Sequence, residues 1–281
     1  MNVLMALFLG VVQGITEFLP ISSSGHLAIF QNFLNMDYDE DAHLLFEVLV
    51  HLGTLISIIA VYRVEIMEMI KDGLDYLRLK SDSNKDEPVV LKPPARALLF
   101  IVIGTLPLFL TLFFMSAITQ LFFNTFFIGF ALIITGCLLF VATKFITQGN
   151  KTDKTMSLID AIYIGVAQAI AVLPGLSRSG TTIAVGLSRG LSGAFAVRFS
   201  LLLSIPAVVG ATLVTLIRAF MSDYPVFAML PTYLAGFVVA AGVGFLAIQF
   251  IRRIMAKGLF GNFAYYCWGV GTLTIILSFF L

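Results

Sequence analysis

Six runs of about twenty apolar residues, each with few charges, recur along the chain. They cover residues 42–62, 97–115, 125–146, 196–217, 230–251 and 262–281. A run of this length crosses the roughly 30 Å hydrocarbon layer of a membrane as one helix. Charged residues make up only 12% of the chain, about half the fraction found in soluble domains. We therefore expect an all-α polytopic membrane protein with about six transmembrane helices.

Two further apolar stretches, residues 3–34 and 157–190, are interrupted near their middles by Pro, Gly and Ser. Each half is too short to cross a membrane, so the two stretches predict re-entrant helix–loop–helix hairpins. Broken backbone at membrane depth is tolerated only where it is buried in protein or lines a wet cavity. Both interruptions should therefore face the interior of the protein.

Basic residues concentrate in three segments between the apolar runs: residues 63–96, 144–154 and 252–257. The positive-inside rule places all three in the cytoplasm and both chain ends outside, with 63–96 as a cytoplasmic loop. Residues 1–281 should form a single membrane domain surrounded by lipids. The net charge of +1 predicts no nucleic-acid partner.

Two cysteines, Cys137 and Cys267, lie within apolar runs. They predict small buried thiols rather than a disulfide.

The sequence repeats itself at an offset of 155 residues. Residues 10–26, GVVQGITEFLPISSSGH, align without a gap with residues 165–181, GVAQAIAVLPGLSRSGT. Each copy is followed by three predicted spans, so the halves, about 1–147 and 156–281, should form an inverted-topology repeat. In that architecture the broken helices of the two halves meet near the membrane midplane and form the binding site. The segments SSSGH and LSRSGTT should therefore face each other.

The first copy carries an acid and a histidine. Gln13 and Glu17 are four residues apart, so they share one helix face and present a carbonyl oxygen and a carboxylate together. An ionisable group in apolar surroundings is a candidate functional residue, although Glu17 could also serve only to bond the loop backbone. His26 can exchange protons near neutral pH. Four residues between Glu17 and His26 contribute hydroxyls and free N–H groups at the start of a helix: Ser22, Ser23, Ser24 and Gly25.

The second copy has Arg178 at the position of Ser23. A guanidinium at this depth requires an anion, either a phosphate held bidentately or the Glu17 carboxylate. Neutral donors follow at the same helix start from Ser177, Ser179, Gly180 and Thr182. Together these residues predict a phosphate-binding site.

The sequence leaves the reaction mechanism open. Phosphoryl transfer needs mainly positioning and charge neutralisation, and the attacking group could be Ser23, His26 or water. We favour Ser23, with His26 accepting its proton. Glu47 and His51 share a face of the third helix and could join the site or only pair with each other. The alternative is a transporter or flippase for a lipid phosphate or another anion, because inverted repeats are common in transporters.

Three segments, QGITEFLPISSSGH, FEVLVHLG and LPGLSRSGTT, closely resemble the signatures of the bacterial undecaprenyl pyrophosphate phosphatases, the bacitracin-resistance family. The resemblance implies hydrolysis of a C55 polyprenyl diphosphate in the bacterial cytoplasmic membrane, at a site open to the outer face. The family's motifs fall on Gln13 and Glu17, on residues 22–26 and on residues 174–182. Within them we assign catalysis to Glu17, Ser23, His26 and Arg178. It also implies a divalent cation, Mg²⁺ or Ca²⁺, held by Glu17 and Gln13, although many members have Glu where this chain has Gln13. A homodimer is left open.

Overall fold

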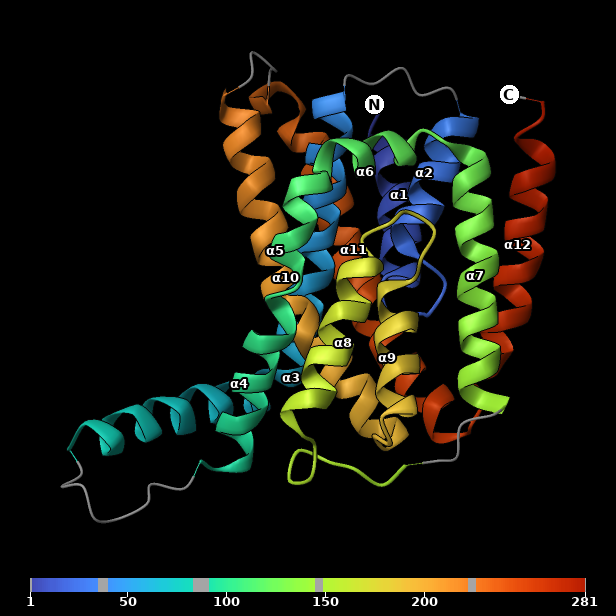
Figure 1. Cartoon of the computed structure of the whole chain (residues 1–281). Coiled ribbons are helices and arrows are strands. Elements are labelled where there is room, and N and C mark those ends of the chain that lie inside the picture. The colour runs from blue at the N-terminus through green and yellow to red at the C-terminus, as the bar shows by residue number, and fades with distance from the viewer. Residues whose placement is uncertain (1, 35–39, 83–90, 145–148, 222–225, 281) are drawn as a thin grey trace.

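The structure is a computed structural model that describes residues 2–34, 40–82, 91–144, 149–221 and 226–280. Within these ranges every regular element is a helix, apart from one isolated β-bridge between Lys151 and Leu191. Figure 1 shows the helices packed side by side in one upright bundle, with both chain ends at the upper end. The expected all-α architecture is confirmed.

The two interrupted stretches form broken helices, as predicted. The first consists of α1 (Val3–Thr16) and α2 (Ser23–Phe33), and the second of α8 (Leu158–Ile170) and α9 (Arg178–Ser188). The offset of 155 carries the bounds of α2 onto those of α9 without a shift. In Figure 1, α1 enters from the upper end and α8 from the lower end, and both hairpins turn back inside the bundle. The division into halves 1–147 and 156–281 stays a prediction.

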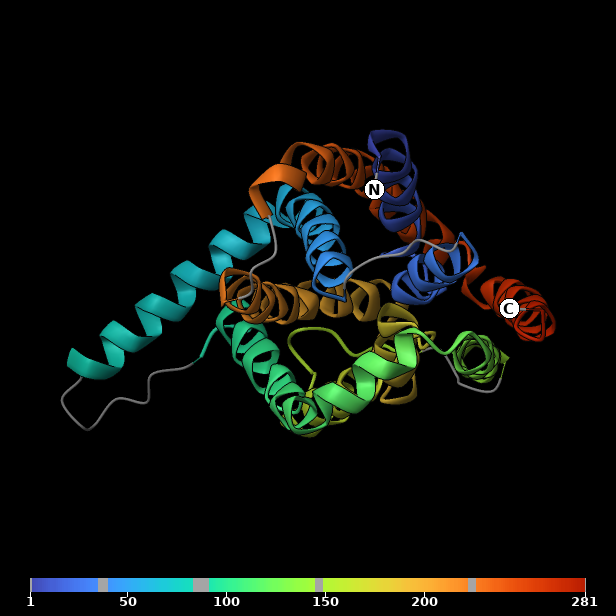
Figure 2. The same cartoon turned by 90° about the horizontal axis from the view of Figure 1, so that it is seen from above.

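Five helical segments in the described residues are long and apolar enough to cross a membrane. These segments are Leu45–Leu79, Pro93–Phe122, Thr125–Lys144, Gly193–Ile217 and Met229–Ala256. In the same order, the helices that contain them are α3 (Glu40–Asp82), the series α4 to α6 described below, α7 (Thr125–Lys144), α10 (Gly193–Met221) and α11 (Val226–Ala256). The sixth predicted crossing forms η2 (Phe260–Asn262) and α12 (Phe263–Leu277), which is only 15 residues long. Figures 1 and 2 show α12 running beside α7.

The predicted crossing at 97–115 is not one straight helix. It consists of α4 (Pro93–Thr105), α5 (Leu108–Thr111), η1 (Leu112–Phe114) and α6 (Met115–Phe122). Pro107 cannot donate a backbone hydrogen bond, so the helix breaks there. The segment between the predicted crossings 97–115 and 125–146 is helical for most of its length, because α6 covers it as far as Phe122. Figure 1 shows α6 lying across the upper end of the bundle, where both chain ends are.

Helix α3 bends at Tyr62, whose φ of −106° and ψ of 19° are not helical. Beyond this bend the helix leaves the bundle, as Figure 1 shows. The predicted loop 63–96 is therefore helical as far as Asp82, and its middle, residues 83–90, lies outside the described residues. The described parts of all three basic segments lie at the lower end in Figure 1, opposite both chain ends.

Small residues allow the hairpins to pack closely against the long helices. A Cβ atom added to Gly10 of α1 would lie 2.5 Å from the Gly236 carbonyl oxygen of α11. Gly165, the repeat counterpart of Gly10, approaches Gly104 of α4 equally closely, at 2.5 Å. Helices in membranes often associate through such small-residue contacts. These contacts fix the depth of both hairpins.

The two cysteines are free, and only one matches its prediction. Cys267 of α12 is buried, whereas Cys137 of α7 is exposed. Helix α7 packs on α12 through Gly129 and Gly136, so Cys137, one residue further on, faces outward. The prediction of a buried thiol is therefore wrong for Cys137.

Candidate active site

The turns that interrupt the two hairpins contact each other inside the bundle. A Cβ atom added to Gly25 would lie 2.9 Å from the Gly175 Cα atom. Ser179 Oγ donates a hydrogen bond to the Leu19 carbonyl oxygen at 3.2 Å. The two turns that carry the serine-rich segments therefore lie next to each other.

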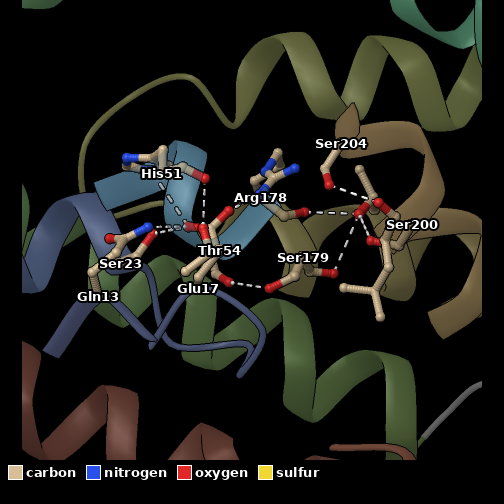
Figure 3. A network of polar contacts seen from close by, with 12 residues as sticks. Gln13, Glu17, Ser23, His51, Thr54, Arg178, Ser179, Ser200 and Ser204 are labelled. Carbon is tan, nitrogen blue, oxygen red and sulfur yellow. Dashed lines mark hydrogen bonds and ion pairs between the residues drawn. The ribbon is translucent and has the colours of Figure 1, made fainter. Parts of the chain in front are cut away.

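Glu17, a buried residue in the first turn, is the centre of a polar network (Figure 3). Its Oε1 accepts a hydrogen bond from the Arg178 guanidinium of α9. Its Oε2 accepts from Ser23 Oγ at 2.6 Å and from Gln13 Nε2 at 3.0 Å. His51 Nε2 of α3 lies 3.3 Å from the same oxygen. Side chains from both hairpins and from α3 therefore converge on one carboxylate.

The serine before each second helix serves as its N-cap. Ser22 Oγ accepts from the Gly25 N–H at 3.2 Å, and Ser177 Oγ accepts from the Gly180 N–H at 3.0 Å. These bonds satisfy helix-terminal donors, as expected for serine caps. Thr182 is also engaged, because its hydroxyl donates to the Arg178 carbonyl oxygen at 2.8 Å.

A cavity of about 360 Å³ opens beside this network. Seven of the residues predicted from the sequence line it: Glu17, Ser22, Ser23, Ser24, Ser177, Arg178 and Ser179. The other four substrate-site candidates do not line the cavity but bond to residues that do: Gln13, Gly25, Gly180 and Thr182. The remaining walls are mostly apolar and come from α5, α6 and residues 206–215 of α10. The cavity thus has a charged end and a long apolar side.

His26 does not occupy the position that the sequence predicted. Its Nδ1 lies 2.8 Å from the Ser22 carbonyl oxygen and its Nε2 lies 2.9 Å from the Tyr266 hydroxyl. Ser23 instead donates to Glu17. His26 lines a second, separate cavity together with Tyr266. The expected Ser23–His26 proton transfer is wrong in this geometry, because the turn directs the two side chains to different sides.

His51, whose role the sequence left open, lines the main cavity together with Glu47. His51 Nδ1 lies 2.7 Å from the Glu47 carbonyl oxygen, so the backbone of α3 orients the ring. This bond directs Nε2 toward Glu17. His51 therefore contacts the charged end of the cavity, whereas His26 does not.

Two polar residues that contribute here were not singled out from the sequence. Gln168 of α8 is buried and lines the main cavity, and its Oε1 has no hydrogen-bond partner. The repeat contained a signal for it, because Gln168 aligns with Gln13. The second is Tyr266 of α12, whose hydroxyl lies 2.9 Å from His26 Nε2.

The donor set near Glu17 fits a hard cation that is completed by ligand oxygens. Gln13 Oε1 is buried beside Glu17 and has no hydrogen-bond partner. Carboxylate and amide oxygens suit Mg²⁺ and Ca²⁺. Within the described ranges no cluster of three or more His, Cys, Asp or Glu side chains could enclose a metal by itself. A cation at this place would therefore need oxygens from the substrate as well.

Comparisons with known proteins agree over nearly the whole chain. Residues 6–273 match the family described as "Bacitracin resistance protein BacA". An undecaprenyl-diphosphatase from Carboxydothermus hydrogenoformans is 38% identical over 99% of this chain and 98% of its own length. One from Methanobrevibacter smithii is 37% identical over 99% of this chain and 98% of its own. Undecaprenyl-diphosphatase 1 from Shouchella clausii is 36% identical over 99% of this chain and 97% of its own length.

Proposed function

This chain belongs to the bacitracin-resistance protein BacA family, and from that membership we propose that it hydrolyses undecaprenyl diphosphate to undecaprenyl phosphate and inorganic phosphate. The reaction would recycle the lipid carrier of cell-wall synthesis. The observation that carries the proposal is the cavity with a charged end at Arg178 and Glu17 and apolar walls from α5, α6 and α10. A polyprenyl diphosphate has the same division between a charged head and a hydrocarbon tail.

Arg178 is the group that would bind the diphosphate. Its planar guanidinium can donate two parallel hydrogen bonds to phosphate oxygens. At present one of its amino groups donates to Glu17. The sequence left two partners open for Arg178, and we propose that it exchanges Glu17 for phosphate when the substrate enters.

Ser23 is our candidate for the attacking group. Its hydroxyl already donates to Glu17 at 2.6 Å, so we assign Glu17, rather than His26, as the proton acceptor. The Ser23 oxygen would form a bond to the terminal phosphorus while the bond to the bridging oxygen breaks. The bridging oxygen would leave with undecaprenyl phosphate, and water would then hydrolyse the phosphoserine.

A divalent cation, Mg²⁺ or Ca²⁺, would be held by Glu17 and Gln13 together with diphosphate oxygens. When bound, the cation supplies neutralisation of phosphate charge. To take part in such a site, Glu17 would have to release at least one of its present donors, Arg178 or Ser23. The Gln13 amide, whose nitrogen now donates to Glu17, would have to turn its oxygen toward the cation. The unpartnered Gln13 Oε1 supports this assignment.

We place the protein in the bacterial cytoplasmic membrane with the active site toward the outer face. The main cavity is lined by α6 and by the second half of α10, which lie toward the end of the bundle that holds both chain ends. The basic segments lie at the opposite end, which the positive-inside rule assigns to the cytoplasm. A homodimer would be compatible with this placement.

The proposal is tested by measuring inorganic phosphate released from undecaprenyl diphosphate by the purified protein. Release that tracks enzyme concentration supports it. Binding of the lipid without phosphate release would indicate a carrier and contradict it.

A variant in the apolar wall tests the substrate class. Gly210 of α10 lines the cavity, and a Cβ atom added there meets nothing within 4 Å, so Gly210→Phe would fill the tail side without a backbone clash. We expect kcat/KM to fall by about tenfold for undecaprenyl diphosphate and by no more than about twofold for farnesyl diphosphate. Gly242→Phe of α11, equally open and outside the cavity, is the control. Equal loss with both substrates would contradict a tail-binding wall.

A further inference from the structure

The first serine turn adopts an unusual backbone conformation. Ser22 has a φ of 69° and a ψ of 95°, and in the described residues it is the one non-glycine residue with a positive φ. Its repeat counterpart, Ser177, has an ordinary φ of −73°. Non-glycine residues hold such conformations only where the surroundings enforce them, often at functional sites. Something specific to the first hairpin must therefore hold Ser22.

His26 supplies that restraint. Its backbone N–H and its Nδ1 contact the same Ser22 carbonyl oxygen, at 3.1 Å and 2.8 Å. A carbonyl oxygen can only accept, so Nδ1 must carry a proton. In the neutral ring, Nε2 is then the acceptor for the Tyr266 hydroxyl, at 2.9 Å. Both ring nitrogens are therefore committed to bonds that involve neither Ser23 nor Glu17.

Helix α12 contacts the same turn at two neighbouring residues. The Tyr266 ring stacks on the His26 ring, with centroids 5.7 Å apart and planes 13° apart. The buried Cys267 Sγ lies 3.7 Å from the Pro20 carbonyl oxygen. The second hairpin differs, because Thr181 replaces His26 there and its buried hydroxyl has no hydrogen-bond partner. The restraint is thus confined to the turn that precedes Ser23.

We propose that Tyr266 and His26 form a positioning pair that holds the Ser22 peptide and thereby directs Ser23 Oγ at Glu17. His26 acts through the backbone of the turn and transfers no proton to or from the substrate. The inference rests on the proposed phosphatase function, in which Ser23 and Glu17 carry the chemistry. It identifies Tyr266, a residue of the last helix, as a determinant of the geometry of the first hairpin.

The first test uses side chains that keep one of the two bonds. An Asn amide can place its nitrogen where His Nδ1 lies, so His26→Asn keeps the donor to Ser22 but has no group that can exchange protons. We expect His26→Asn to keep a kcat at least about tenfold above that of His26→Leu. Tyr266→Phe should lower kcat by about fivefold with KM changed by less than about twofold. Tyr265→Phe, the exposed neighbour, is the control.

A double variant separates this pair from a general loss of structure. Because Asn lacks the Nε2 acceptor, Tyr266→Phe should have no further effect on kcat in the His26→Asn background. Additive losses, or His26→Asn as inactive as His26→Leu, would overturn the proposal. The second of these results would return His26 to a chemical role.

A measurement without turnover keeps the inference separate from the proposed function. In a Ser23→Cys protein that also carries Cys137→Ala, the alkylation rate of the thiol reports how position 23 is held against Glu17. We expect Tyr266→Phe to raise that rate at least about threefold, because the thiol leaves its partner, and Tyr265→Phe to leave it unchanged. An unchanged rate in Tyr266→Phe would overturn the pair even if the wild-type protein released phosphate. A raised rate in a protein that releases none would contradict only the phosphatase.

Discussion

The two hairpins have nearly the same backbone and almost opposite chemistry. Each consists of a short helix, a turn, a serine cap and a second helix whose bounds coincide at an offset of 155 residues. The first hairpin contributes an acid, Glu17, and a hydroxyl, Ser23, whereas the second contributes a guanidinium, Arg178. Neither set would form a phosphate-processing site by itself. Their juxtaposition combines a carboxylate, a nucleophile and an anion-binding group.

The difference extends to how each hairpin is held. The first turn is restrained from α12 through Tyr266 and His26. The second hairpin is instead fixed at its start, where Asp160 of α8 accepts from Lys151 at 2.8 Å and from Arg189 at 2.9 Å. The proposed nucleophile, Ser23, therefore lies on the turn with a strained residue, and the proposed phosphate-binding guanidinium, Arg178, lies on the hairpin with ionic support.

The largest effect should come from replacing Arg178, the guanidinium that the second hairpin contributes. Arg178→Lys keeps the charge but loses the bidentate fork, so we expect kcat/KM to fall at least about a hundredfold. Phosphate release under the same assay measures it. Arg198→Lys, which lies in a partly exposed pair with Asp153, is the matched control. Activity within about threefold of the wild type would remove Arg178 from the mechanism.

The ionic support of the second hairpin should be visible in stability. Burial opposes the ionisation of Asp160, but the bonds from Lys151, Ser157 and Arg189 outweigh it and lower its pKa from 3.8 to about 2. Because the pKa of Asp160 is lower in the folded than in the unfolded protein, ionised Asp160 stabilises the fold at pH values above its unfolded pKa. This contribution is lost as pH falls from about 4 to about 2. Asp160→Asn should lower the free energy of unfolding by about 2 kcal/mol at neutral pH.

Thermal unfolding in detergent measures this change, with Asp153→Asn as control, because the Asp153–Arg198 pair is more exposed and longer, at 3.3 Å. The control should cost no more than about 0.5 kcal/mol. Equal losses in the two variants would show that the Asp160 cluster has no special role.

A smaller effect concerns the cation proposed for the first hairpin. Because Glu17 is also the proposed proton acceptor, Glu17→Gln should lower kcat even at saturating cation. It should in addition raise the Mg²⁺ or Ca²⁺ concentration for half-maximal activity by about tenfold, because a charged ligand is lost. The cation should also raise the unfolding temperature of the wild type more than that of Glu17→Gln. Full activity in excess chelator would leave Glu17 as a proton acceptor only.

Much of this arrangement could be predicted from residue patterns. The interrupted stretches 3–34 and 157–190 indicated broken helices because clustered Pro, Gly and Ser favour a turn over a continuous span. The repeat indicated that the two serine segments meet, and Gln13 and Glu17 share the face that their spacing predicts. These features depend on local chemistry and symmetry, which a sequence displays directly.

The remaining features depend on tertiary contacts. The spacing of three residues suggested that His26 and Ser23 share a face, but the positive φ of Ser22 and the Tyr266 contact separate them. His51 could be assigned to the site only once α3 had been placed beside Glu17. Pro107 accounts for the break in the predicted crossing 97–115, but the orientation of α6 across the end of the bundle (Figure 1) depends on how it packs against the other helices.

The most direct test of the divided roles is to identify the group that receives the phosphate. The reaction is quenched during turnover of undecaprenyl diphosphate labelled at the terminal phosphorus, and the peptide spanning residues 18–34 is analysed by mass. The account predicts phosphate on Ser23, with more label trapped in the wild type than in Arg178→Lys. Phosphate on His26, or an unlabelled peptide together with inversion at a chirally labelled phosphorus, would contradict it.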